Sequence, residues 1–181
     1  MMNLTPQVVG PVSSTPRHAV LVPVDFSSCS REALKYACDF ICEIGAPMLI
    51  LHVVHETVGE SGHYRKHCSA GNARPMADIA VDMLDEFIYS VKKELRSPDV
   101  LDAATKIVIE GLPASRIHEV AEHKNAAFII MGTHGRKGLS RLALGSVAEK
   151  VLQQSTVPVT VIKNPPVGNN NSAKNYTGWL S

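Results

Sequence analysis

Short apolar runs alternate with longer amphipathic segments through most of the chain. Five runs are rich in aliphatic and β-branched residues, as is typical of strands: Ala19–Asp25, Met48–Val54, Thr105–Ile109, Phe128–Met131 and Val157–Ile162. Apolar residues follow one another in these runs instead of alternating with polar ones, which indicates that both faces of each strand are covered. Such strands are characteristic of a parallel sheet between two layers of helices.

The segments between the runs place apolar residues three and four positions apart, which is the period of a helix. Four helices are predicted: Arg31–Ile44, Pro75–Arg96, a shorter helix that begins at Pro113, and Val147–Gln154. Ser27 or Ser28 is suited to cap the first helix, and Gly45 is suited to end it.

The resulting order of elements is strand–helix repeated four times, followed by a last strand. This order predicts an α/β fold with an open five-stranded parallel sheet, right-handed crossovers and helices on both faces. In such sheets, ligands bind beyond the carboxyl ends of the strands. The loops of interest are therefore those that follow Asp25, Val54, Gly111 and Met131.

The two ends of the chain lack this pattern. Residues 1–17 contain three prolines and no hydrophobic period, and residues 164–181 are polar and rich in turn-forming residues. We therefore expect a flexible N-terminal arm over 1–17, one domain over 18–163, and a C-terminal tail over 164–181. A polar loop is predicted from His55 to Arg74.

Composition narrows the class of protein. The chain has 181 residues, 45% of them hydrophobic, and a net charge of +1. The small net charge provides no long-range attraction to nucleic acid or to acidic membranes. No apolar run reaches the roughly 20 residues of a membrane helix, and the N-terminus does not resemble a signal peptide. We expect a cytoplasmic protein with no membrane or nucleic-acid partner, in which the four cysteines are reduced core thiols.

The most unusual stretch is MGTHGRKGLSRLALGS, from Met131 to Ser146, which follows the fourth strand. It contains four glycines and three basic residues. An ordinary loop between a strand and a helix needs about 2 to 6 residues, whereas thirteen lie between Gly132 and Ser146. Glycine lets backbone amides approach a ligand closely, and the start of the following helix adds free N–H groups and a positive dipole end. The stretch therefore predicts a phosphate site.

The spacing of this loop distinguishes it from two other phosphate-binding motifs. It is neither G-x-x-x-x-G-K-[ST] nor G-x-G-x-x-G, because the chain reads G-x-x-G, nine residues, then G-S. Ser146 and Glu149 also have the S-x-x-E spacing of a capping box. The Ser146 hydroxyl is thus expected either to cap the last helix or to bind a phosphate oxygen.

This glycine signature closely resembles that of the nucleotide-binding members of the universal stress protein family. The first strand with its turn, LVPVDFS, the second strand, LILHVV, and the ending STVPVTVIK are similar to family motifs as well. The resemblance extends over residues 19–163. It implies a Rossmann-like sheet, of the adenine nucleotide alpha hydrolase type, with strand order 3-2-1-4-5.

The resemblance also implies where ATP, or a related adenine nucleotide, would bind. Asp25 would accept hydrogen bonds from ribose hydroxyls, beside Pro23 and Val24, and Val53 would flank the adenine. The phosphates, with or without Mg²⁺, would lie against the glycine loop. Its binding residues would be Met131, Gly132, Thr133, His134, Gly135, Arg136, Gly145, Ser146 and Val147.

Neither a metal site nor a catalytic group is predicted. His52 and His55 are three apart on a strand and so point to opposite faces. His63, His67 and Cys68 are expected to lie in a solvated loop. His134 has no obvious partner in the sequence that would orient a water molecule for it.

We therefore predict a regulatory or stress-response protein that acts through its nucleotide-bound state and is at most a slow ATPase. Two alternatives are a nucleotide-free interaction module of the same fold and an adenylyl-transferring or pyrophosphatase-like enzyme. The intact glycine signature argues against the first. The sequence DFSSCS, without glycine after the first strand, argues against the second. The last strand, with Val159, Thr160, Val161 and Ile162, is predicted to form a homodimer by edge pairing.

Overall fold

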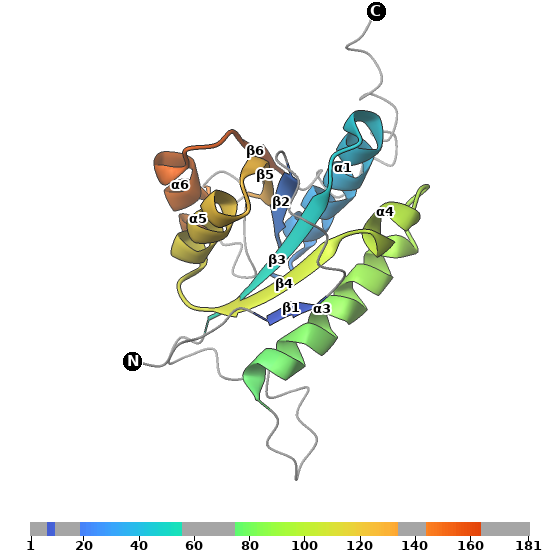
Figure 1. Ribbon diagram of the computed structural model, residues 1–181, viewed down its shortest axis with the longest axis horizontal. Coiled ribbons are helices and arrows are strands. Elements are labelled where there is room, and N and C mark those ends of the chain that lie inside the picture. The colour runs from blue at the N-terminus through green and yellow to red at the C-terminus, as the bar shows by residue number, and fades with distance from the viewer. Residues whose placement is uncertain (1–6, 10–18, 56–74, 134–143, 164–181) are drawn as a thin grey trace, which may run out of the picture.

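The computed structural model describes residues 7–9, 19–55, 75–133 and 144–163 (Figure 1). Its centre is a sheet that lies between two groups of helices. The parallel strands are β2 (Ala19–Pro23), β3 (Met48–Val54), β4 (Thr105–Glu110), β5 (Ala126–Gly132) and β6 (Val159–Ile162). They are arranged in the order β4-β3-β2-β5-β6, which is 3-2-1-4-5 when counted from β2 along the chain. The predicted sheet is thereby confirmed.

A sixth strand extends the sheet at its β4 edge. β1 (Gln7–Val9) pairs with β4 in the antiparallel direction, with Val8 opposite Ile107. No strand is predicted here from the sequence, because a run of three residues between prolines is too short to show a hydrophobic period. The prediction of a flexible arm over 1–17 therefore missed a strand that joins the sheet.

The helices lie close to their predicted positions. They are α1 (Ser28–Ile44), α3 (Met76–Lys92), α4 (Asp99–Asp102), α5 (Pro113–His123) and α6 (Ser146–Gln154). Ser27 caps α1 by accepting a hydrogen bond from the Ser30 amide, and Gly45 ends it at φ 67°. The single predicted helix Pro75–Arg96 ends at Lys92, and the short α4 was not predicted.

The two faces of the sheet carry separate apolar cores. α1 and α3 cover one face and pack on alternate strand residues such as Val20, Val22 and Ile50. α5 and α6 cover the other face. They pack on the intervening residues of the same strands, including Leu21 and Leu51 (Figure 1). This alternation explains why the strands are apolar throughout.

Three cysteines fall within the described residues, and all are free thiols. Cys29 and Cys38 are buried as predicted, and burial raises the pKa of Cys38 to about 12. The prediction is wrong for Cys42, which is exposed although it lies only one helical turn beyond Cys38. Separately, in the part of the chain that the structure describes, no helix is long and apolar enough to cross a membrane.

Candidate functional site

The order of the strands reverses direction between β2 and β5. The chain leaves β2 for α1 on one face of the sheet, and it leaves β5 for α6 on the other face. In α/β proteins, ligands bind beyond the carboxyl ends of neighbouring strands whose connections diverge in this way. Most of the residues predicted to bind the nucleotide lie at this switch point.

Asp25 lies in the turn between β2 and α1 and is half-buried. Its Oδ1 accepts hydrogen bonds from the Ser27 amide at 3.1 Å and from the Ser27 hydroxyl at 2.6 Å. Among the described residues, none donates a hydrogen bond to Oδ2. The turn therefore holds the carboxylate through one oxygen and leaves the other for a ligand.

The other predicted residues on this side come from β2 and β3. Pro23 is buried and pairs with Leu51, and Val24 is 4% exposed. Val53 is half-buried and packs against the core beneath α5 and α6. Two strand ends thus bring an apolar surface next to Asp25.

Gly132 ends β5 where the first turn of α1 passes very close. A Cβ placed at Gly132 would lie 2.7 Å from the backbone carbon and 2.9 Å from the carbonyl oxygen of Cys29. Real Cβ atoms do not approach backbone atoms so closely, so only glycine fits here. Gly132 was predicted to bind phosphate, and the structure shows that it also has a packing role. Its neighbour Met131 is buried in the core.

The predicted phosphate loop closes on itself at its base. Gly145 N donates a hydrogen bond to Thr133 O at 2.8 Å, and Thr133 N donates to Ile162 O at 2.9 Å. Thr133 is buried, and its Oγ1 lies 3.9 Å from Cys29 Sγ. The chain therefore leaves β5 and returns to α6 at one point. His134, Gly135 and Arg136 lie outside the described residues.

α6 begins one residue earlier than a capping box at Ser146 requires. Gly145 is its N-cap residue, with φ −67° and ψ 146°, and Ser146 is the first residue of the helix. The predicted capping role of Ser146 is therefore wrong. Ser146 is exposed, whereas Val147 is half-buried against the α5–α6 core. The exposed first turn leaves the Ser146 hydroxyl available to a ligand.

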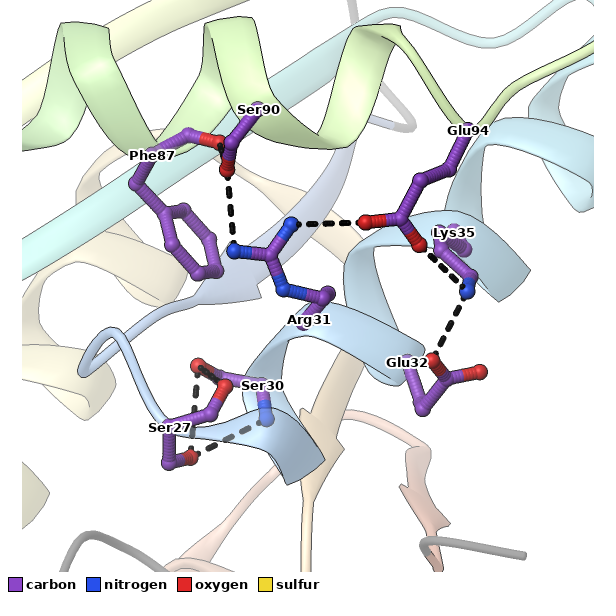
Figure 2. Close-up of polar contacts among 8 residues, drawn as sticks. All are labelled: Ser27, Ser30, Arg31, Glu32, Lys35, Phe87, Ser90 and Glu94. Atoms are coloured by element: carbon purple, nitrogen blue, oxygen red, sulfur yellow. Dashed lines mark hydrogen bonds and ion pairs between the residues drawn. The ribbon is translucent and has the colours of Figure 1, made fainter.

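Sequence reasoning did not identify the polar contacts that support this site. Figure 2 shows Arg31 of α1 donating to Glu94 Oε1 at 3.1 Å and to Ser90 Oγ at 2.9 Å. The guanidinium carbon also lies 5.0 Å from the centre of the Phe87 ring. These contacts join α1 and α3 just beyond the Asp25 turn. Partners that are distant in sequence have no local pattern, so the sequence alone gave no signal for them.

Lys35 completes this cluster. Its ammonium group lies 2.8 Å from Glu32 and 3.0 Å from Glu94. The hydrogen bond from Lys35 is the main reason that the pKa of Glu94 is lowered, and Arg31 adds to the effect. Burial alone would lower the pKa of Lys35, but its two carboxylate partners together raise it. Both groups are thus stabilised in their charged forms.

Several known proteins are similar to this chain in sequence and in fold. The model of the universal stress protein family matches residues 16–163. Universal stress protein MJ0531 of Methanocaldococcus jannaschii is 33% identical over 146 residues, which is 81% of this chain and 82% of that protein. The solved structure of MJ0577, from the same organism, is 30% identical, covers 82% of this chain and 97% of its own, and has a TM-score of 0.61.

Two further solved structures contain adenine nucleotides. A universal stress protein in complex with cAMP is 22% identical over 80% of this chain and 96% of its own, with a TM-score of 0.53. One from Archaeoglobus fulgidus in complex with dAMP is 19% identical over 82% of this chain and 99% of its own, with a TM-score of 0.52. At these identities the likeness shows a shared fold. Together with the family match over 16–163, the comparisons establish that the chain belongs to the universal stress protein family.

Proposed function

We propose that the protein binds ATP at the switch between β2 and β5 and acts as a stress-response regulator through its nucleotide-bound state. One observation carries this proposal. The Asp25 turn, the end of β5 and the start of α6 meet at one end of the sheet, joined by the Gly132–Cys29 contact and the Thr133–Gly145 hydrogen bond. A carboxylate that suits ribose therefore lies on one side of the switch point, and a helix N-terminus lies on the other.

Each part of the nucleotide has a chemically suitable partner. The Oδ2 atom of Asp25 suits a ribose hydroxyl, because a carboxylate only accepts hydrogen bonds. The half-buried Val53 suits one face of the adenine. The phosphates suit the start of α6, where Gly145 and Ser146 offer backbone amides and a hydroxyl at the positive end of the helix dipole. Mg²⁺ bound together with ATP would offset part of the negative charge of the phosphates.

The relatives support an adenine nucleotide as the ligand. Two members of the fold family were solved with cAMP and with dAMP, which share adenine and a phosphate with ATP. The choice of ATP rests on the long loop after β5, because a triphosphate needs more donors than a monophosphate. No catalytic group is assigned, so hydrolysis of bound ATP is expected to be slow.

The proposal is tested by thermal shift on nucleotide-stripped protein with Mg-ATP, ATP with EDTA, cAMP, dAMP and GTP. Ligand at 100 times its dissociation constant adds about 2.7 kcal/mol, which raises the Tm of a domain of this size by roughly 5 to 10 °C. We expect this shift with ATP and none with GTP. A larger shift with Mg-ATP than with ATP and EDTA would show that Mg²⁺ contributes to ATP binding.

Two results would contradict the proposal. If folded, stripped protein shows no shift with any nucleotide, the chain is better described as an interaction module. If ATP is converted at many turnovers per minute, it is an enzyme instead of a nucleotide-held regulator. The first result is read from the melting curves themselves, and the second from product release at saturating ATP.

We further propose that the protein forms a homodimer through β6, which lies at the edge of the sheet. Ile129 N donates to Pro158 O, and Thr133 N donates to Ile162 O, so even-numbered residues of β6 face β5. The backbone groups of Val159 and Val161 therefore face the open edge. Pairing this edge with a second copy would cover it.

Val161→Pro removes one outward N–H without removing a donor that faces β5. We expect the unmodified protein to have the mass of a dimer by light scattering and Val161→Pro to have that of a monomer. Val161→Thr, which keeps both the N–H and the branched side chain, is the control. A monomeric unmodified protein at micromolar concentration would exclude this dimer.

A further inference from the structure

His52 is a polar residue in the middle of an apolar strand. Its side chain is 1% exposed, on the face of the sheet that α1 and α3 cover. Its Nδ1 lies 2.9 Å from Val24 O, on the neighbouring strand end. Because a carbonyl oxygen only accepts hydrogen bonds, Nδ1 carries the proton and donates it. A buried histidine thus contacts the residue that immediately precedes Asp25.

This contact fixes the peptide that leads into Asp25. Val24 N donates to Leu51 O at 2.8 Å, while Val24 O accepts from His52. Both backbone groups of Val24 are therefore bound to β3. The carbonyl of Val24 belongs to the same peptide plane as the Asp25 amide, so the donor His52 sets the direction in which the chain enters residue 25.

The residue that follows Asp25 is held by the same ring. Phe26 has φ 65°, a left-handed conformation that is rare for a bulky residue and costs roughly 1 kcal/mol or more. Its ring stacks on His52 with centroids 4.2 Å apart and an interplanar angle of 29°, and it meets Phe87 edge-on at 5.5 Å. The turn at Phe26 also brings Ser27 back to Asp25 Oδ1.

We propose that His52 is a positioning residue for the nucleotide site, which acts through Asp25. One buried ring holds both neighbours of Asp25, by a hydrogen bond to Val24 and by stacking on Phe26. It thereby fixes the carboxylate with Oδ2 toward the ribose before the ligand arrives. This inference rests on the proposed function, because it names the device that aligns the ribose contact of that same site.

The readout is the ribose penalty, which is the factor by which affinity falls when ATP loses one ribose hydroxyl. Dissociation constants are measured for ATP, 2′-deoxy-ATP and 3′-deoxy-ATP, and the larger of the two ratios is taken. In the unmodified protein we expect about tenfold, since a hydrogen bond to a charged group is lost. His52→Leu and Asp25→Asn should each reduce this penalty to about twofold.

Two further variants separate positioning from general destabilisation. Ile50→Val lies on the same strand and the same face, two residues before His52, and should keep the full penalty at a similar loss of stability. His52→Asn places an amide nitrogen where Nδ1 lies, so it should restore part of the penalty that His52→Leu removes. If His52→Leu does not fold, Phe26→Leu removes the stacking ring and should reduce the penalty in the same direction.

The outcomes separate the two proposals. If the unmodified protein does not bind ATP, the proposed function fails, and this inference fails with it. If it binds ATP with a ribose penalty that a folded His52→Leu or Phe26→Leu variant retains, only the inference is overturned. A penalty that Asp25→Asn leaves unchanged also overturns the inference, because Asp25 would not be the ribose acceptor.

Discussion

The two sides of the candidate site are held in place by opposite means. The Asp25 turn is fixed by side chains: the carboxylate binds Ser27, and the aromatic ring of Phe26 stacks on buried His52. The end of β5 is fixed by the absence of a side chain, because Gly132 lets the backbone of Cys29 come within contact distance. The base of the loop after β5 is then closed by backbone hydrogen bonds alone.

This difference suggests that the two sides of the site bind different parts of a ligand. The many side-chain contacts on the Asp25 side suit the ribose contact that we propose, because a carboxylate that accepts from ribose needs a defined direction. The glycines on the β5 side suit the phosphate contact that we propose, because binding through backbone amides needs close approach and few side chains. Substitutions on the two sides should therefore differ in how much they affect stability without ligand and how much they affect affinity for ATP.

The largest effect is expected from Gly132→Val. The new side chain would have to displace the backbone at Cys29, which costs at least about 2 kcal/mol of folding free energy. For a domain of this size, that lowers the Tm by roughly 4 to 8 °C or more. Differential scanning calorimetry without ligand measures it. An unchanged Tm would mean that the close contact is not required for folding.

Gly145→Val tests the same loop at its other end and should mainly affect binding. Gly145 has φ −67° and ψ 146°, which any residue adopts, so the stability cost is limited to about 1 kcal/mol for a poorer N-cap. ATP binding should be lost, because a branched side chain blocks approach to the amides. Calorimetric titration of the folded variant measures this, and an ATP affinity equal to that of the unmodified protein would contradict the proposed grip.

Asp25→Asn tests the side-chain-held half of the site. We expect ATP affinity to fall about tenfold through loss of a charge-assisted hydrogen bond to ribose. The Tm without ligand should change little, because Asn can still accept a hydrogen bond from the Ser27 amide. ATP, ADP and AMP should lose affinity by the same factor, since all three share the ribose. A loss confined to ATP would place Asp25 at the phosphates instead.

The smallest effect concerns the ion pairs that join α1 to Glu94, in the turn that follows α3 (Figure 2). Glu94→Gln should cost less than about 1 kcal/mol, because the Glu94 side chain is 44% exposed. The pKa of Glu94 is lowered in the folded state. The charged carboxylate therefore stabilises the fold above the pKa of the unfolded chain, near 4.5, and this stabilisation is lost as the pH falls through the pKa of the folded state.

The difference in Tm between the unmodified protein and Glu94→Gln should therefore be present at pH 7 and shrink below about pH 4.5. Glu86→Gln, at an exposed position of α3, the helix that precedes Glu94, is the control. A difference that grows toward acid pH would mean that Glu94 is not stabilised as a carboxylate by Lys35 and Arg31.

The sheet could be predicted from the sequence because its signals are local. Continuous apolar runs identify strands, and β3 has the predicted bounds Met48–Val54. The switch point follows from strand order, which the family resemblance supplied. β1 was missed because three residues carry no period, and its place depends on pairing with β4.

The site could be predicted only in part. Asp25 and Gly132 were identified as residues at strand ends, and Gly145 and Ser146 as residues at the start of the last helix. His52 was considered only as a metal ligand, because its role depends on Val24 and Phe26, which lie on another strand end. The packing role of Gly132 could not be predicted from the sequence either, because its contact Cys29 is more than 100 residues away along the chain.

The most direct test of the account is hydrogen exchange of the ligand-free protein against the protein with Mg-ATP. We predict that ATP slows exchange of the backbone amides at 26–30 and 145–147, at the two sides of the switch point, and leaves those of β1 and β4 unchanged. Slower exchange at a different edge of the sheet, or no change with saturating ATP, would contradict a nucleotide site between β2 and β5.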